Sequence, residues 1–211
     1  MNSRDEILNQ LQQSHREATM PEPWQSRRDF ADLAERFTQA LTAVFGEVRQ
    51  AENLDGAWQL VGEIIEELNA EKIVVNGERP LTEYNFPQKW PQIHWHIVGQ
   101  SDDGDLRQFC TDANLGISGA EAALAETGSV LVISGSAQSR LATLLPPVHL
   151  ALVPTSILTT DLFTWTAVRQ NPMPANLVFV SGPSKTADIE QTMAVGVHGP
   201  KRFIVILYND Q

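Results

Sequence analysis

A group of small and polar residues stands at 181–186, where an apolar run ends and a helical pattern is expected to begin. Its members that could contact a ligand are Ser181, Gly182, Ser184, Lys185 and Thr186. Free backbone amides at the start of a helix attract anions, and Lys185 would add a positive charge. Ligands of α/β sheets also bind beyond the carboxyl ends of strands. The pattern therefore predicts an anion site, with a helix-capping turn that holds no ligand as the alternative.

The same order of apolar run, small residues and helix occurs at 134–140. Ser134 and Gly135 follow the run, and Arg140 stands on the expected helix. An arginine at this place would pair with a carboxylate or phosphate. We expect the loops at Ser134 and Ser181 to converge on one pocket at one edge of the sheet. The alternative is a second capped helix, with Arg140 on the solvated surface.

Three further positions carry titratable side chains. Glu126 precedes a Thr-Gly-Ser turn, and in a hairpin that faces a cleft it would act as a general base or nucleophile. His198, within Gly-Val-His-Gly-Pro, would cap carbonyls or act as an acid, a base or a carboxylate binder. An ordinary turn glutamate and a structural histidine are the alternatives. His94 and His96 alternate along one expected strand, but no aspartate stands at a spacing that supports a metal site.

The elements that must position these residues follow from the hydrophobic pattern. A helix is expected at 3–14, and a second from 27 to 45 with Ser26 as its N-cap. From residue 46 on, strands are expected at 46–50, 71–76, 92–99, 148–154, 176–182 and 202–208. A hairpin is favoured within 114–134, with a helix as the alternative for its alanine-rich first arm. Helices are expected between the strands at 54–70, 155–170 and 185–197, with a short helix after a polar turn within 101–113 and another from 136 that Pro146 and Pro147 end. This alternation predicts an α/β domain at 47–211, an open, mostly parallel sheet flanked by helices, after an N-terminal helical extension at 1–46.

Charge and composition exclude several classes of function. The 211 residues include 26 acidic and 15 basic ones, which gives a formal net charge of −11. Such a chain repels a phosphate backbone, so nucleic acid is not an expected partner. No apolar stretch reaches the roughly 18–20 residues of a membrane span. The polar N-terminus lacks the apolar core of a signal peptide, so we expect a cytoplasmic protein.

Cys110 is the single cysteine. One thiol cannot form an internal disulfide or a redox pair, and it cannot hold an iron–sulfur cluster. We therefore expect no cofactor on this chain, and the metal centres of any electron transfer would belong to partners. The sequence also lacks GxGxxG, GxxxxGKS/T, HExxH and GxSxG, so the usual sites of dehydrogenases, kinases, zinc proteases and serine hydrolases are not visible.

Four stretches, ETGSVLVISG, RLATLLPPVHLALVP, FVSGPSKTADIE and GVHGP, together resemble the LUD-domain family, in particular its lactate utilization protein C branch. The resemblance covers roughly residues 70–211. It implies a fold similar to the sugar-phosphate isomerase and CoA-transferase superfamily. It also implies a place in a three-component system that oxidises L-lactate to pyruvate, whose other components are iron–sulfur proteins. The positions that the resemblance singles out are Glu126, Gly128, Ser181, Gly182, Pro183, Ser184, Thr186, Asp188, Glu190, His198 and Gly199.

Two functions from different classes remain open at this point. The first is a cluster-free component of that lactate-oxidising system, which binds a small carboxylate or phosphate or organises its partners. The second is a stand-alone enzyme that acts on a phosphorylated sugar or a CoA ester, by analogy with other proteins of the fold. A purely structural adaptor is a third hypothesis.

Overall fold

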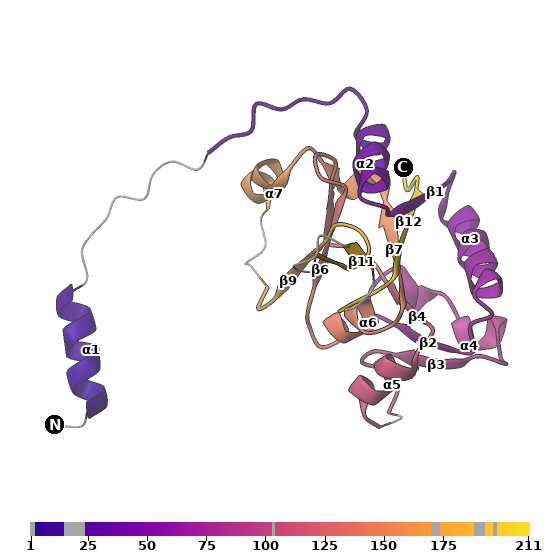
Figure 1. Cartoon of the computed structure of the whole chain (residues 1–211), viewed down its shortest axis with the longest axis horizontal. Helices are drawn as coiled ribbons and strands as arrows, with labels where there is room; N and C mark the ends of the chain where they lie inside the picture. The colour runs from indigo at the N-terminus through magenta and orange to yellow at the C-terminus, as the bar shows by residue number, and fades with distance from the viewer. Residues whose placement is uncertain (1–2, 15–23, 103, 170–173, 188–192, 196–197) are drawn as a thin grey trace.

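The chain folds around two β-sheets that contribute to one hydrophobic core cluster (Figure 1). The computed structural model describes residues 3–14, 24–102, 104–169, 174–187, 193–195 and 198–211. A six-stranded parallel sheet forms the centre, a four-stranded mixed sheet lies beside it, and a short antiparallel pair completes the strands of the described residues.

The central sheet confirms the predicted open parallel arrangement. Its strands, in spatial order, are β1 (Glu47–Ala51), β12 (Arg202–Tyr208), β7 (Val148–Pro154), β4 (Leu115–Ser118), β2 (Lys72–Val75) and β3 (His94–Ile97). Every neighbouring pair in this sheet is parallel. The middle strands are buried on both faces, which is why they read as continuous apolar runs in the sequence.

Helices cover both faces of this sheet. On one face lies α3 (Leu54–Glu67), whose Val61, Ile64 and Ile65 pack against Ile73 and Leu150. The 3-10 helix η1 (Leu81–Glu83) and α4 (Phe86–Lys89) follow β2 on this face. The opposite face is covered by α5 (Leu106–Asp112), α6 (Arg140–Leu144) and α2 (Leu33–Ala43). Among the described helices, none is long and apolar enough to cross a membrane.

The second sheet contains the predicted hairpin. Its order is β8 (Leu158–Thr159), β5 (Ala122–Leu124), β6 (Ser129–Ile133) and β9 (Leu177–Val180). The β5–β6 pair is antiparallel and turns at Gly128, whose φ of 65° is one that glycine adopts without strain. The α2 residues Phe37 and Leu41 are fully buried between this sheet and the central one.

Two helix predictions near the C-terminus are wrong. The segment 155–170 holds only a short helix, α7 (Leu162–Val168), after the 3-10 helix η2 (Thr155–Ile157) and β8. In place of a helix at 185–197, β10 (Lys185–Ala187) pairs antiparallel with β11 (Met193–Val195). The Ser184 amide donates to the carbonyl of Pro200 at 2.8 Å, so the two ends of this segment lie together. A helix of that length would hold its ends about 19 Å apart.

The N-terminal helices also differ in part from the prediction. The first, α1 (Ser3–Ser14), has the predicted bounds and no buried residue. The second begins later than predicted, because its N-cap is Asp32, whose side chain accepts the Glu35 amide at 2.9 Å. Ser26 does not cap a helix and instead donates to the carboxylate of Asp161.

Candidate functional site

The strands β2 and β4 are neighbours, and beyond them the chain winds in opposite directions across the sheet. From β2 the chain proceeds outward to β3, whereas β4 is followed by β7 and β12 on the other side. This is the place where ligands of open α/β sheets bind, next to the carboxyl ends of the strands. Here β2 ends in Asn76, Gly77 and Glu78, and β4 ends in Ser118 and Gly119.

Hydrogen bonds hold these strand ends in a fixed arrangement. The Gly119 amide donates to Oε1 of Glu78 at 2.6 Å. A side chain at position 119 would come within 3.1 Å of that oxygen, so glycine permits the contact. Asn76 is fully buried, and its Oδ1 accepts the amide of Ser139 at 2.9 Å. The Gly77 amide donates to the Ala137 carbonyl at 2.7 Å, which holds the loop at 134–139 against the end of β2.

The carboxyl group of Glu78 has a raised pKa. Its burial disfavours the charged form, and the negative charge of Glu121 adds to this effect, while hydrogen bonds from Gln138 and the Gly119 amide lower the pKa in part. Glu121 itself is paired with Arg169, whose side chain is 9% exposed. Glu121 is thus paired with an arginine, while the neighbouring Glu78 has a raised pKa. Such a pair is suited to general acid–base chemistry.

A hollow of about 520 Å³ is linked to Glu78 through Gln138. It is lined by Ser134, Gln138, Ser139, Arg140, Leu141, Ala175 and Asn176. Gln138 connects the two features, since it lines the hollow and also hydrogen-bonds Glu78. Arg140 is exposed and offers a positive charge to a carboxylate or phosphate in the hollow. The predicted residues Ser134 and Arg140 therefore lie together.

The predicted convergence of the two loops is wrong, because β6 and β9 are antiparallel. Val130 pairs with Val180 and Ile133 with Leu177, so Ser134 follows one end of the pair and Ser181 the other. At about 3.4 Å per residue the two serines are roughly 17 Å apart. Ser181 instead contacts Ser129, with 2.7 Å between the hydroxyl oxygens.

The loop at Ser181 also lacks the helix start that would bind an anion. The Ser184 amide is used by Pro200, and the Lys185 amine lies over the ring of Phe45 at 4.2 Å. Gly182, with φ of 114°, passes close to the Val44 carbonyl. His198 is exposed, and Gly199 packs beside Ser184. The positions Asp188 and Glu190 lie outside the described residues, as does the Thr186 side chain, and ligand binding by this loop stays a prediction.

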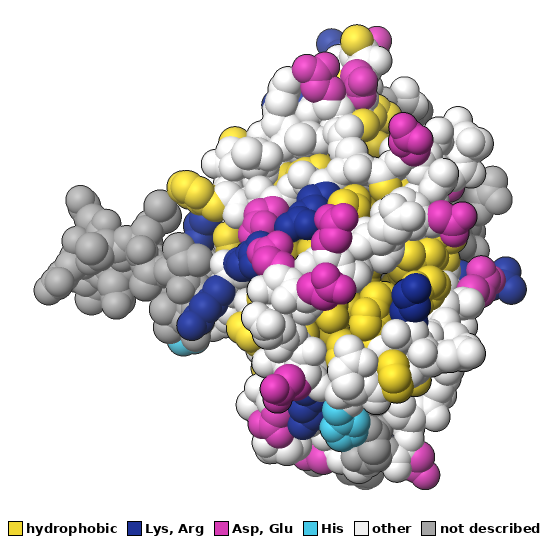
Figure 2. Space-filling view, turned by 90° about the vertical axis from the view of Figure 1, so that its right-hand side faces the viewer, with side chains coloured by type: hydrophobic (Ala, Val, Ile, Leu, Met, Phe, Trp, Pro, Cys, Tyr) yellow, Lys and Arg dark blue, Asp and Glu magenta, His cyan; other side chains and the backbone are white. Residues whose placement is uncertain are grey.

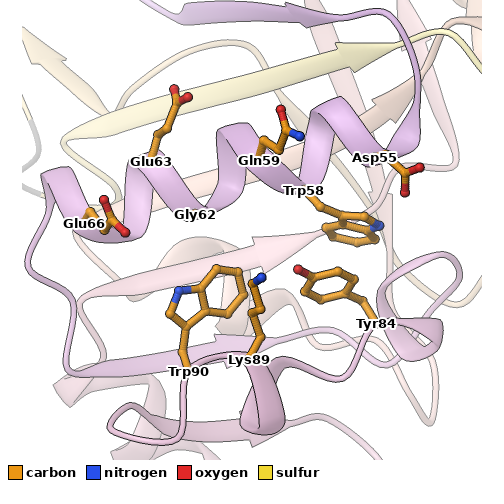
Figure 3. Close-up of a pocket in the computed structure, with 9 residues that line it drawn as sticks. All are labelled: Asp55, Trp58, Gln59, Gly62, Glu63, Glu66, Tyr84, Lys89 and Trp90. Carbon is orange, nitrogen blue, oxygen red and sulfur yellow. The ribbon is translucent and has the colours of Figure 1, made fainter.

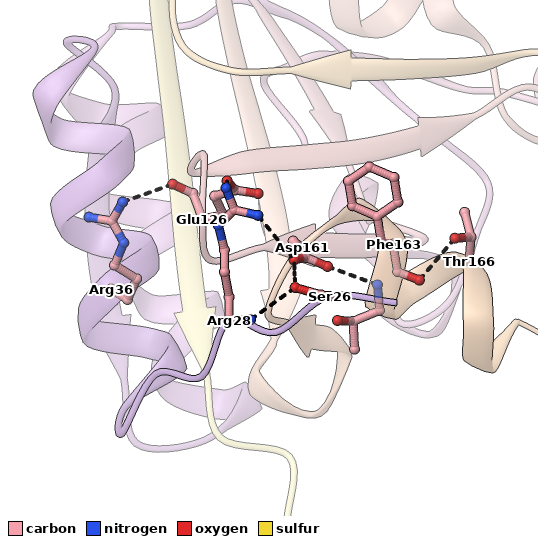
Figure 4. A network of polar contacts seen from close by, with 8 residues as sticks. Ser26, Arg28, Arg36, Glu126, Asp161, Phe163 and Thr166 are labelled. Carbon is pink, nitrogen blue, oxygen red and sulfur yellow. Dashed lines mark hydrogen bonds and ion pairs between the residues drawn. The ribbon is translucent and has the colours of Figure 1, made fainter. Parts of the chain in front are cut away.

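Glu126 belongs to a polar network that binds the segment 24–32 to the hairpin and to α7 (Figure 4). Its carboxylate pairs with Arg28 at 2.9 Å, and its carbonyl accepts from Arg36 at 3.0 Å. At the centre lies the fully buried Asp161, which receives the Ser26 hydroxyl and caps α7 through the Thr164 amide at 2.8 Å. These contacts give Glu126 a structural role, and catalysis by this residue stays a prediction.

We expect the Asp161→Ala substitution to lower the free energy of unfolding by about 1–3 kcal/mol at pH 7, because it removes the helix cap and the acceptor for Ser26. Burial alone would raise the pKa of Asp161, but hydrogen bonds from Ser26 and Thr164 and the charge of Arg28 hold that pKa below its usual value. The carboxylate therefore stabilises the fold above about pH 4, and this stabilisation is lost as the pH falls through the lowered pKa.

Urea unfolding of the wild type and Asp161→Ala at pH 7 and near pH 3 measures this difference. The difference in free energy of unfolding between the two proteins should be smaller at the lower pH. The control Asp161→Asn keeps a capping oxygen and should lose less stability at pH 7. A gap that stays the same at both pH values would contradict the assigned role of the charge.

Cys110, His96 and His149 are buried, whereas His94 is exposed. Burial raises the pKa of the Cys110 thiol to about 11, so the reactive thiolate is scarce at neutral pH. His149 is fully buried, bonds to the Ser118 hydroxyl at 2.8 Å, and has its pKa lowered to about 3 by burial. His94 and His96 both lie against the ring of Phe109. Within the described part of the chain, no group of three or more His, Cys, Asp or Glu is placed to hold a metal ion.

Comparison with known proteins places this chain in a family. The LUD domain model matches residues 34–208, and the chain belongs to the LUD domain family. A lactate utilization protein C 1 from Bacillus mycoides is 32% identical over 72% of this chain and 69% of its own length. A lactate utilization protein C from Halalkalibacterium halodurans is 27% identical over 85% of this chain and 80% of its own length.

A solved structure supports the fold. The crystal structure of a DUF162 family protein from Deinococcus radiodurans superposes with a TM-score of 0.54 at 19% identity, over 83% of this chain and 96% of that one. The family resemblance noted in the sequence is thereby confirmed, together with the open α/β architecture.

Proposed function

We propose that this protein acts in lactate utilization and binds a small hydroxy or oxo acid where β2 and β4 end. Relatives of similar length carry the name lactate utilization protein C, which supports the general role. The observation that carries the site is Glu78, a half-buried carboxyl group of raised pKa that Gln138 links to a hollow with an exposed arginine. Arg140 would bind the carboxylate of the acid. Glu78, which Gln138 links to the hollow, would accept a proton.

Oxidation of L-lactate to pyruvate releases two protons and two electrons. Glu78 offers an acceptor for a proton, but the electrons need a separate acceptor. Cys110 is buried and is the single cysteine of the chain, so it cannot supply the several thiolate ligands of an iron–sulfur cluster. We infer that iron–sulfur proteins, as cytoplasmic partners, take the electrons. An enzyme for sugar phosphates or CoA esters is the alternative.

Deletion of the gene in its host tests the general role. The deletion strain should fail to grow on L-lactate as sole carbon source, grow normally on glucose, and recover when the wild-type gene is returned. Iron–sulfur proteins should also be retained with the tagged protein from lactate-grown cells. Normal growth of the deletion strain on lactate would contradict the proposal. Thermal stabilisation of the purified protein by a sugar phosphate or a CoA ester, but not by lactate or pyruvate, would favour the alternative.

A further inference from the structure

A second hollow lies on the other side of the central sheet, between α3 and the segment that carries η1 and α4 (Figure 3). Its volume is about 510 Å³, and Trp58, Tyr84 and Trp90 form its aromatic wall. Trp58 and Tyr84 are stacked with 4.3 Å between ring centroids. Gly62 leaves room for Trp90 beneath α3, since a side chain there would come within 3.1 Å of the indole. The hollow is separate from the site where β2 and β4 end.

The rim of this hollow is acidic. Asp55, Glu63 and Glu66 are exposed on α3, but Glu63 is paired with Arg49 at 3.8 Å. Figure 3 shows Asp55 near Tyr84 at one end and Glu66 at the other. Figure 2 shows this face of the molecule, where carboxylates lie among Lys and Arg side chains and beside exposed apolar ones. Aromatic faces and carboxylates both attract cations, so the chemistry of the hollow favours a positively charged, partly apolar group.

The shape of the hollow indicates an extended occupant. Asp55 and Glu66 are about 16 Å apart along the helix axis. A further hollow of about 370 Å³, lined by Tyr84, Asn85, Gln88 and Lys89, shares Tyr84 and Lys89 with the first. We define these two hollows together as the α3–α4 groove. It is longer than a single small amine requires, and the amine of Lys89 rises into its middle (Figure 3).

We propose that the α3–α4 groove binds an extended basic segment of a protein partner. A lysine or arginine side chain of that segment lays its aliphatic part against Trp90 and Tyr84. Its charged head lies beside Asp55 or Glu66 at one end of the groove, and the net charge of −11 on this chain favours approach of such a segment. Lys89 carries the same charge as the occupant and weakens the complex.

Fluorescence anisotropy of a labelled peptide of alternating arginine and leucine tests the proposal on the full chain. The peptide should bind the wild type, and a peptide of alternating glutamate and leucine should not. Trp90→Ala should weaken binding roughly five- to tenfold, because the cation loses its aromatic face. Lys89→Ala, an exposed change that spares the fold, should instead tighten binding about twofold or more.

Two double variants of equal net charge test whether the peptide is attracted only by the overall negative charge of the protein. Asp55→Asn with Glu66→Gln removes two charges at the groove, whereas Asp5→Asn with Glu6→Gln removes two from α1. The first pair should weaken binding severalfold more than the second. Equal losses, absence of binding to the wild type, or unchanged affinity in Lys89→Ala would overturn the proposal. If arginine amide binds saturably and Trp90→Ala weakens this binding to the same extent, the groove is a site for a small cation. This result would overturn the proposal of a protein partner.

Discussion

Replacing Glu78 with glutamine is expected to abolish growth on L-lactate while the protein stays folded. Glutamine has the same shape and retains an oxygen for the Gly119 amide, so the strand ends keep their arrangement. It cannot exchange a proton, and loss of a general acid or base typically lowers a rate by about 10²–10⁴-fold. The measurement is growth of the deletion strain on lactate after return of the Glu78→Gln gene, with protein abundance checked by immunoblot.

Glu126→Gln is the matched control for this experiment. Glu126 is also a half-buried glutamate, but its carboxylate is paired with Arg28 rather than placed at the strand ends. Its substitution should leave growth on lactate close to normal. Full growth with Glu78→Gln and loss of growth with Glu126→Gln would move the site from the end of β2 to the hairpin.

The Gly128→Ala substitution is expected to cause the largest loss of stability. An alanine at φ of 65° carries the strain of the left-handed region, about 1–2 kcal/mol. Its Cβ would also lie 2.3 Å from the backbone nitrogen of Leu41, so α2 would have to move from the core. We expect the free energy of unfolding to fall by about 3–5 kcal/mol in urea, in the range of severe core substitutions.

The Gly104→Ala substitution separates backbone strain from the clash with α2 as causes of the lost stability. Gly104 has φ of 92°, but a side chain there would meet no atom within 4 Å. This variant should show the conformational strain alone, about 1–2 kcal/mol. Equal losses in both variants would mean that the contact between the hairpin turn and α2 adds nothing to stability.

The central sheet was predictable because its strands are buried on both faces. Continuous apolar runs such as 73–75 and 203–208 are typical of strands buried on both faces. The helices between these strands indicate that neighbouring strands are parallel. The errors arose where distant contacts decided the local structure. Ser26 has the composition of a helix cap, yet its hydroxyl bonds to Asp161, and the helix begins at Asp32. Likewise, the hydrogen bond between Ser184 and Pro200 brings together the two ends of a segment that was predicted to be helical, and this segment holds the strand pair β10–β11.

The site was only partly visible in the sequence. Ser134 and Arg140 were identified from their place after an apolar run, and the structure puts both in one hollow. Glu78 was missed, although Asn-Gly-Glu follows the buried strand β2 directly and is the same kind of signal. The raised pKa of Glu78 comes first from its burial by the folded chain, and the charge of Glu121, which is far away along the chain, adds a smaller part. The position of Ser181 depends on the antiparallel pairing of β9, which periodicity alone does not indicate.

Calorimetric titration with L-lactate and pyruvate tests most directly whether a small acid binds where β2 and β4 end. Arg140 and Lys185 are both exposed cations, but they follow opposite ends of the β6–β9 pair, which makes Lys185→Ala the control for Arg140→Ala. We expect saturable binding of at least one acid to the wild type. The affinity for this acid should be at least about tenfold lower in Arg140→Ala than in the wild type. In Lys185→Ala it should be unchanged. Loss of binding in Lys185→Ala but not in Arg140→Ala, or no heat from either acid, would contradict this assignment.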